Sequence, residues 1–134
     1  MESGYTDVVA NFNHTDDSFQ FSIAGGYTGF SAGALAFGSS YAGTDTNLDI
    51  SLDNFISISN ATEFANAEAA VYSIATGRGS GALYLTYTNS TTHATTLAYD
   101  SNRNDGAAGG TAHDVATLNT VNGTVDHTDI VIAT

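Results

Sequence analysis

The sequence predicts a mainly β domain, either a β-sandwich or a short β-roll-like fold, with one amphipathic helix at about residues 60–76. Three observations support this fold class. Several short segments alternate apolar with polar residues, as strands with one buried face do. One segment instead repeats its apolar residues at three- and four-residue spacing, the period of an amphipathic helix. The length of 134 residues suits a single domain, so we expect residues 1–134 to fold as one unit.

Strands are expected from the first residues onward. Residues 6–12 (TDVVANF) are rich in β-forming side chains, and a polar turn follows at residues 13–17. Residues 18–24 (SFQFSIA) alternate and place two phenylalanines and an isoleucine on one face. Residues 25–44 are rich in Gly, Ser and Ala with interspersed aromatic residues, which indicates short strands or ordered loop. Residues 48–58 alternate Leu and Ile with Asp and Ser before a further apolar stretch, and predict another strand.

The one helix is expected between Asn60 and Thr76. Its apolar residues fall on a single face of a helix, and they are Phe64, Ala67, Val71, Ile74 and Ala75. Asn60 and Glu63 form an N-x-x-E capping pattern, and Gly77 is placed to end the helix.

The second half of the chain returns to strands. Residues 82–88 (ALYLTYT) and 94–99 (ATTLAY) predict a hairpin, because two alternating runs flank a short polar turn. A loop rich in Gly, Asn and Asp spans residues 100–112, and a short strand is expected near residues 115–118. The closing residues 129–132 (DIVI) predict a final buried strand or a hydrophobic tail.

The charge of the chain excludes two classes of partner. Fourteen Asp and Glu face two Arg and no Lys, which gives a net charge of −12. A nucleic-acid binder needs Lys and Arg to displace counterions from phosphate, so we expect no nucleic-acid partner. Anionic membranes are excluded for the same reason, and no apolar run approaches the length of a membrane helix, so we expect no membrane insertion. Cations should be attracted, and with no cysteine their ligands are not thiolates.

The loop after residue 99 is a candidate calcium site. Asp100, Asn102, Asn104 and Asp105 offer oxygen atoms from one short segment that ends in a glycine turn, and Ca²⁺ takes six to eight oxygen ligands from such loops. The match to an EF-hand is incomplete, because the glycine falls one position late and Thr111 stands where a bidentate Glu is expected. The alternative is a solvated turn in which Asn and Asp bond to their own backbone.

A second stretch partly follows a calcium-binding pattern. Residues 109–116 (GGTAHDVA) match the leading glycines and the Asp of the nonapeptide G-G-x-G-x-D-x-U-x, which makes Asp114 a further candidate ligand. Ala112 replaces the third glycine, and a single copy cannot stack into a β-roll. Other acidic groups are more often solvated charges than ligands, and they are Asp16 with Asp17, Asp45, Asp49, Asp53, and Asp126 with Asp129.

Nothing in the sequence predicts catalysis. The four histidines each lie near Ser, Thr or Asp, but no G-x-S-x-G elbow or H-E-x-x-H pair occurs, and we expect no enzyme. A secreted hydrolase or carbohydrate-binding domain remains an alternative, with Tyr84, Tyr87 and Tyr99 as a sugar platform. The competing interpretation of these tyrosines is that they belong to the core or to cross-strand pairs.

The order of the elements carries a resemblance to a known family. Residues 7–12 (DVVANF) and 17–22 (DSFQFS) resemble the D-x-I-x-D-F and D-x-I-x-F/L-S passage that follows the calcium repeats of repeats-in-toxin (RTX) proteins. Later runs are similar to the C-terminal ends of these proteins, namely 66–70 (NAEAA), 81–84 (GALY), 97–100 (LAYD), 115–118 (VATL) and 129–132 (DIVI). The chain thus resembles the C-terminal, post-repeat region of RTX proteins that bacteria export by type I secretion, as found in surface-layer, matrix and adhesin proteins.

The resemblance implies an extracellular or cell-surface location and an uncleaved C-terminal signal, at about residues 82–134, that the type I secretion machinery reads. The tandem nonapeptide array is absent, so Asp114 alone sits on a matching calcium position. The expected function is that of a non-enzymatic, calcium-responsive structural protein that self-associates into a filament or layer, with Ile130, Val131 and Ile132 as candidate assembly residues. The alternative is a module that caps a larger RTX protein and carries its secretion signal.

Overall fold

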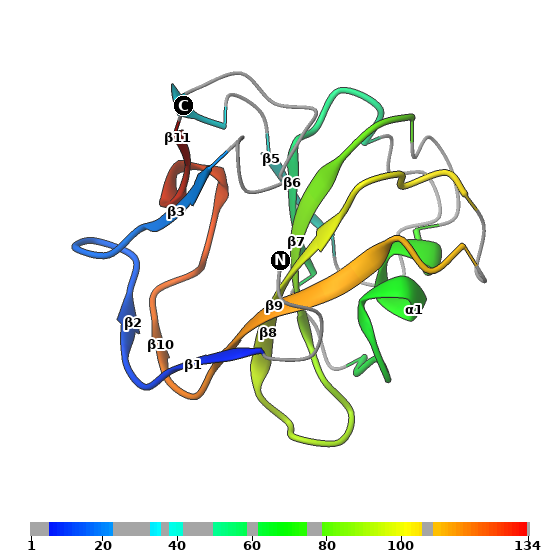
Figure 1. Cartoon of the computed structure of the whole chain (residues 1–134). Coiled ribbons are helices and arrows are strands. Elements are labelled where there is room, and N and C mark those ends of the chain that lie inside the picture. The colour runs from blue at the N-terminus through cyan, green and yellow to red at the C-terminus, as the bar shows by residue number, and fades with distance from the viewer. Residues whose placement is uncertain are drawn as a thin grey trace.

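The computed structural model confirms a mainly β fold with one short helix (Figure 1). It describes residues 6–22, 33–35, 38–41, 50–58, 62–74, 79–105 and 109–133, and all structural statements refer to these residues. Within these ranges, no helix combines the length and the apolar character needed to cross a membrane.

A six-stranded mixed sheet forms the middle of the molecule. Its order is β1-β9-β8-β7-β6-β5, and the strands are β1 (Asp7–Val9), β9 (Ala112–Leu118), β8 (Thr95–Asp100), β7 (Leu83–Thr88), β6 (Phe55–Ile58) and β5 (Gly38–Tyr41). The predicted hairpin is confirmed, because β7 and β8 pair antiparallel from Leu83 opposite Asp100 to Thr88 opposite Thr95. β9 continues this antiparallel arrangement, whereas β1, β6 and β5 join the sheet through parallel pairs.

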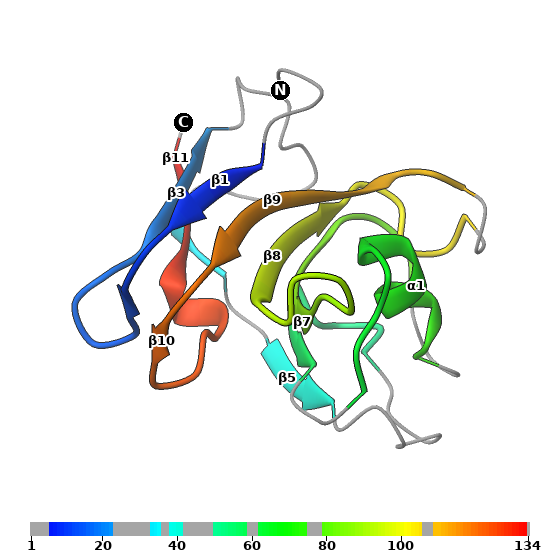
Figure 2. The same ribbon diagram turned by 90° about the horizontal axis from the view of Figure 1, so that it is seen from below.

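The N-terminal and C-terminal segments run parallel to each other through three successive strand pairs. β1 pairs with β9, β2 (Phe12–Asn13) pairs with β10 (Val121–Asn122), and β3 (Phe19–Ser22) pairs with β11 (Ile130–Ala133). Figure 2 shows the blue N-terminal strands beside the orange and red C-terminal ones. The last pair belongs to a three-stranded sheet of order β3-β11-β4, where β4 is Gly33–Ala34. Each of the three N-terminal strands thus pairs with a strand from the C-terminal part of the chain.

One hydrophobic core lies between the six-stranded sheet and these terminal strands. Apolar side chains of β6, β7, β8 and β9 supply the sheet side, and those of β2, β3 and β11 supply the other side. Its aromatic residues pack closely with tilted rings: the ring centroids of Phe21 and Tyr84 are 4.7 Å apart, and those of Tyr84 and Tyr99 are 5.1 Å apart. Ring contacts at such separations add to the free energy already gained from burial.

A second core lies on the opposite face of the sheet, beneath the helix α1 (Ala67–Tyr72) (Figure 1). Ala67, Ala70 and Val71 of the helix pack over Leu83 and other apolar residues of β6 and β7. Both faces of the central strands are therefore buried, which is why β7 is buried at every position but its last. The period-two alternation in β7 divides residues between two cores rather than between core and solvent.

The helix is shorter than the sequence predicts. It begins after Asn66, whose side-chain oxygen caps the backbone N–H of Ala69 at 2.8 Å. Phe64 instead forms an isolated bridge beside β7: its N–H donates to the carbonyl of Thr88, and its own carbonyl accepts from Ser90. Pairing with the sheet thus satisfies the backbone N–H and C=O groups of Phe64, a residue that the apolar periodicity predicts to lie in the helix. The predicted cap Asn60 and the predicted terminator at residue 77 lie outside the described residues.

A β-bulge sets the faces of β9. The register with β8 shifts so that Ala116 lies opposite Leu97 and Asp114 lies opposite Ala98, which makes Val115 the additional residue. Ala112 therefore packs against the core beneath α1, whereas Ala116 packs in the core on the opposite face. The strand was predicted near residues 115–118, but it starts at Ala112, directly beside the loop that holds the candidate calcium ligands.

Candidate functional site

Two of the predicted calcium ligands meet at the hydroxyl group of Thr111. Thr111 Oγ1 lies 2.8 Å from Oδ1 of Asp100 and 2.6 Å from Oδ2 of Asp105. The backbone carbonyl oxygen of Asn102 lies 3.4 Å from the same hydroxyl. We call Asp100, Asn102, Asp105 and Thr111 the Thr111 cluster. A hydroxyl carries one proton, so it can donate to only one of these three oxygens at a time.

Asp100 holds the cluster to the sheet. It is the last residue of β8 and is almost completely buried, and its Oδ1 also accepts a hydrogen bond of 2.9 Å from the backbone N–H of Asn102. Burying a carboxylate is costly unless hydrogen bonds or a nearby positive charge compensate for the lost hydration. The cluster supplies the hydrogen bonds, and a positive charge comes from Arg103.

Arg103 is a buried cation beside this cluster. Its guanidinium donates to the backbone carbonyls of Ile50, Gly81 and Ala82, and so joins the loop after β8 to the start of β7. Burial lowers the pKa of Arg103 below its usual value, while the negative charges of Asp100 and Asp53 act in the opposite direction. An arginine keeps its charge even so, because its pKa in water lies above about 12.

The opposite end of the loop is anchored from the helix. Glu68, in the first turn of α1, accepts hydrogen bonds from the backbone N–H groups of Gly110 (3.2 Å) and Ala112 (3.1 Å). A side chain on Gly109 would overlap the carboxylate of Asp105, so any other residue here would have to displace Asp105. The loop that carries Thr111 is thus placed by α1, by β8 and by the absence of a Cβ at residue 109.

The remaining predicted calcium ligands lie elsewhere. Asn102 and Asn104 are exposed, and the contact of Asn102 with the cluster is made by its backbone carbonyl. Asp114, on β9, accepts a 2.8 Å hydrogen bond from the hydroxyl group of Tyr87. Burial together with this bond raises the pKa of Tyr87, so the tyrosine stays protonated and continues to donate. Asp114 therefore acts as a partner of a core tyrosine and is not part of the Thr111 cluster.

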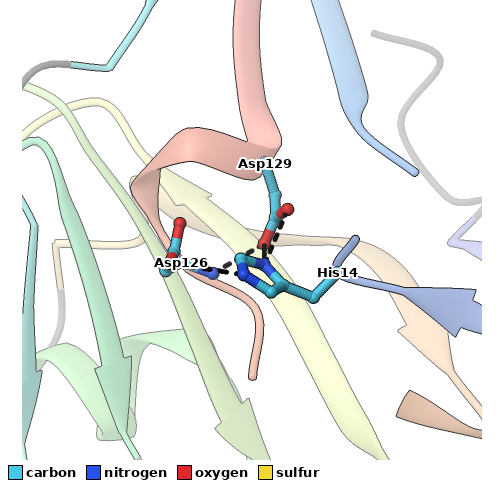
Figure 3. Close-up of side chains that lie close together, drawn as sticks. All are labelled: His14, Asp126 and Asp129. Carbon is cyan, nitrogen blue, oxygen red and sulfur yellow. Dashed lines mark hydrogen bonds and ion pairs between the residues drawn. The ribbon is translucent and has the colours of Figure 1, made fainter. Parts of the chain in front are cut away.

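A separate group of three side chains joins the two ends of the chain (Figure 3). His14 follows β2. Asp126 is the N-cap of the short 3₁₀ helix η2 (His127–Asp129), which precedes β11, and Asp129 is the last residue of that helix. The Nδ1 atom of His14 lies 3.1 Å from both carboxylate oxygens of Asp129, and its Nε2 atom lies 3.9 Å from Oδ2 of Asp126. We call these residues the His14 cluster. It is the one group of three or more His, Asp or Glu found close enough to hold a metal ion among the described residues.

Hydrogen bonds orient both carboxylates of the His14 cluster. Asp126 caps η2 by accepting from the backbone N–H and the hydroxyl group of Thr128, while Asp129 accepts from the backbone N–H of Asp126. The pKa of His14 is raised, first by its hydrogen bond to Asp129 and then by the negative charges of Asp129 and Asp126. The pKa of Asp126 is lowered: partial burial opposes the shift, but the bonds from Thr128 and the nearby histidines outweigh burial.

The proposed assembly residues lie inside the fold. β11 is the middle strand of its sheet, between β3 and β4, and Ile130 and Ile132 are buried in the core. Val131 is half-buried and pairs with Ala34 of β4. The expectation that these three residues serve assembly therefore needs correction, because β11 pairs with β3 on one edge and with β4 on the other.

The tyrosines suggested as a sugar platform are also internal. Tyr84, Tyr87 and Tyr99 are all among the buried residues, Tyr84 and Tyr99 in one core and Tyr87 in the other. They pack within the domain and form no exposed platform, which corrects that alternative. The interpretation as core aromatic residues is the one that their burial supports.

Sequence reasoning missed Thr111 and the His14 cluster. The position of Thr111 indicated a ligand, because an EF-hand carries its last ligand there. A Thr differs from the bidentate Glu that is expected at this position, so Thr111 was not predicted as a ligand. The His14 cluster had no usable signal. Its members are separated by more than a hundred residues, and the parallel pairing of the chain ends is what brings them together.

Comparisons with family models, with curated proteins and with solved structures find no match to this chain. The resemblance to RTX proteins therefore stays a prediction from the sequence.

Proposed function

We propose that this chain is a non-enzymatic, extracellular, calcium-responsive structural domain, exported by a type I secretion system. The observation that carries the calcium part of the proposal is the Thr111 cluster. Oxygens of two carboxylates lie within 2.8 Å of a single hydroxyl, which has one proton for both of them. A divalent cation would neutralise the surplus negative charge on these oxygens.

The ligand chemistry of the cluster suits Ca²⁺. The ion binds carboxylate, carbonyl and hydroxyl oxygens at about 2.3–2.6 Å, so neighbouring ligands in its shell lie roughly 3 Å apart. The oxygens of Asp100, Asp105 and Asn102 lie 2.6–3.4 Å from that of Thr111, which is this spacing. Water would supply the remaining ligands. The net charge of −12 favours binding of any divalent cation at low ionic strength.

Calcium at this position would stabilise more than one loop. The Thr111 cluster joins the end of β8 to the segment before β9, and Glu68 connects the same segment to α1. An ion bound there would stabilise the packing of the helix against the sheet. In a calcium-poor cytosol the chain would be less stable, and in millimolar extracellular calcium it would gain the free energy of binding.

Export and self-association complete the proposal. Residues 82–134 would carry the type I secretion signal, and the folded domain would act at the cell surface or in a matrix. Self-association would use the outer strands of the six-stranded sheet, β1 and β5, since β11 is internal in the described part of the chain. Exposed strand edges are the usual route to such assembly.

A calcium titration tests the central claim. We expect thermal unfolding of the wild type to shift upward between EDTA and 10 mM Ca²⁺. An affinity in the range of extracellular modules, with 10 mM at 100 times the dissociation constant, gives a gain of about 2.7 kcal/mol. Asp105→Asn and Thr111→Val should lose most of the shift. Asp7→Asn removes the same charge from an exposed position on β1 and should retain it.

An unchanged melting temperature and circular dichroism spectrum of the wild type would contradict calcium responsiveness. If the melting temperature of Asp105→Asn rises with Ca²⁺ as much as that of the wild type, calcium binds outside the Thr111 cluster. Export is tested separately by fusing residues 82–134 to a passenger protein and co-expressing a type I exporter. Passenger in the medium is the expected result, and a fusion of residues 1–58 serves as the control. Retention of both fusions in the cell would contradict the secretion signal.

A further inference from the structure

We infer that the His14 cluster is a second cation site, selective for a transition-metal ion of the Zn²⁺ type. In this site Nε2 of His14 and Oδ2 of Asp126 bind the ion, and Asp129 orients the imidazole. The inference is independent of the calcium proposal, because it uses different residues at a different place in the fold (Figure 3).

The contact with Asp129 determines which nitrogen of His14 is free. A carboxylate can only accept hydrogen bonds, so the Nδ1 atom 3.1 Å from Asp129 carries the proton. The Nε2 atom of the neutral ring then presents a lone pair. A metal-binding histidine commonly donates its other N–H group to a carboxylate in this way, which fixes both the tautomer and the ring orientation. The side chain of Asp129 is 3% exposed, as expected of a positioning residue behind a ligand.

The spacing on the other side of the ring leaves room for an ion. Nε2 of His14 and Oδ2 of Asp126 are 3.9 Å apart, which is too long for a hydrogen bond. Zn²⁺ binds nitrogen and carboxylate oxygen at about 2.0–2.2 Å, so two such ligands can be separated by up to about 4.2 Å across one ion. The His14 and Asp126 side chains are 36% and 42% exposed, so the ion can enter from solvent and keep water ligands.

The second oxygen of Asp126 is already occupied. Oδ1 accepts from the backbone N–H of Thr128 at 2.7 Å and from its hydroxyl group at 2.6 Å, which holds the carboxylate with Oδ2 toward His14. His14 itself packs closely against Gly123, where a Cβ would lie 3.0 Å from the Cβ of His14. Both ligand side chains are thus oriented before any ion binds.

The choice of metal follows from the ligand types. An imidazole with a carboxylate suits Zn²⁺, Ni²⁺, Co²⁺ or Cu²⁺, whereas Ca²⁺ prefers oxygen ligands alone. The His14 cluster should therefore discriminate against calcium even in a millimolar excess. The Thr111 cluster has the opposite preference, since it contains no nitrogen ligand.

Isothermal titration calorimetry with Zn²⁺ on untagged, metal-free protein tests the inference. The variants are His14→Gln and Asp126→Asn; Asn is as good a helix cap as Asp, so the second change keeps η2 capped. His93→Gln is the matched control, because His93 also lies beside a carboxylate, with its Nδ1 atom 2.9 Å from Glu63, but belongs to no group of three such residues in the part of the chain that the structure describes. Asp129→Asn tests the positioning role through Zn²⁺ affinity measured on protein whose spectrum shows it to be folded.

We expect one Zn²⁺ per chain in the wild type and in His93→Gln, with no competition from 10 mM Ca²⁺. The affinity should fall at least ten-fold in His14→Gln and Asp126→Asn, and about ten-fold in Asp129→Asn. Absence of saturable Zn²⁺ binding, or equal affinity in His14→Gln, would overturn the inference and leave a simple ion pair. If a variant does not fold, the imidazole NMR signals of wild-type His14 decide: a selective shift with Zn²⁺ supports the site, and no shift overturns it.

Discussion

The imidazole of His14 contacts the buried carboxylate of Asp129 although 115 residues separate them in the sequence. The contact joins the turn after β2 to the helix η2 before β11, at the side of the molecule where the two chain ends run parallel. Its strength depends on protonation, because the pKa of His14 is raised by Asp129. His14 therefore binds its proton more tightly in the folded chain than in the unfolded chain.

This contact predicts a specific pH dependence. A raised folded-state pKa gives a stabilisation that is complete below the unfolded-state value near 6.5 and is lost as pH rises through the folded-state value. The difference in melting temperature between the wild type and His14→Gln, measured in EDTA, should therefore be larger at pH 5.5 than at pH 8.5. Comparison with the variant removes the effect of the other acidic groups. A difference that grows with pH would contradict the contact.

Removal of the Arg103 guanidinium should be strongly destabilising. Arg103→Met leaves the carbonyls of Ile50 and Ala82 without this donor and the buried Asp100 without its nearby positive charge. Loss of one partner from such a buried charged group costs about 3–5 kcal/mol. Urea unfolding measures the change. Asn104→Ala, an exposed neighbour, should stay within about 0.5 kcal/mol of the wild type, and a similarly small effect at Arg103 would contradict its role.

Two adjacent glycines should respond differently to alanine. A Cβ at residue 109 overlaps the Asp105 carboxylate, so Gly109→Ala should displace Asp105 from Thr111 and weaken the calcium-dependent rise in melting temperature. Gly110 has a φ of 70° with open space beside it, so Gly110→Ala should cost about 1–2 kcal/mol of backbone strain and leave the calcium effect unchanged. Thermal unfolding with and without Ca²⁺ separates the two, and equal calcium effects would argue against the Thr111 cluster.

The closing strand should be essential for folding. Ile130 is fully buried in the core, and Ile130→Ala should lower the free energy of unfolding by about 2–5 kcal/mol. Val131, the next residue, is half-buried, and Val131→Ala should cost clearly less. Urea denaturation measures both. A small effect at Ile130 combined with impaired assembly would instead favour the original expectation that these residues serve self-association.

The first residue of the helix can be tested through its cap. Asn66→Ala removes the acceptor for the N–H of Ala69 and should cost about 0.5–2 kcal/mol, whereas Asn66→Ser keeps a capping oxygen and should cost less. Chemical denaturation gives both values. Equal stability of the alanine and serine variants would indicate that the helix starts elsewhere.

The local sequence pattern was sufficient to predict those elements whose structure depends on neighbouring residues alone. The β7–β8 hairpin was predicted correctly, because alternation and a polar turn act over a few residues, and of the two alternatives for the closing residues the strand is the one that forms. The helix was predicted too long, because Phe64 bonds to the backbone around β7 instead of entering the helix. Nothing in the sequence indicated that Asp114, predicted as a calcium ligand, accepts a hydrogen bond from Tyr87 on another strand.

The sequence by itself determined the mainly β fold class, the hairpin and the helical segment, since these follow from the period of the apolar residues and from the turn residues. Only the tertiary structure decided that the N-terminal and C-terminal strands run parallel, that β11 is the middle strand of its sheet, and that Thr111 and His14 each contact two carboxylates. These features depend on contacts between residues far apart in the sequence. Such contacts are selected by the packing of two cores on one sheet, and no local pattern encodes which distant strand will lie alongside.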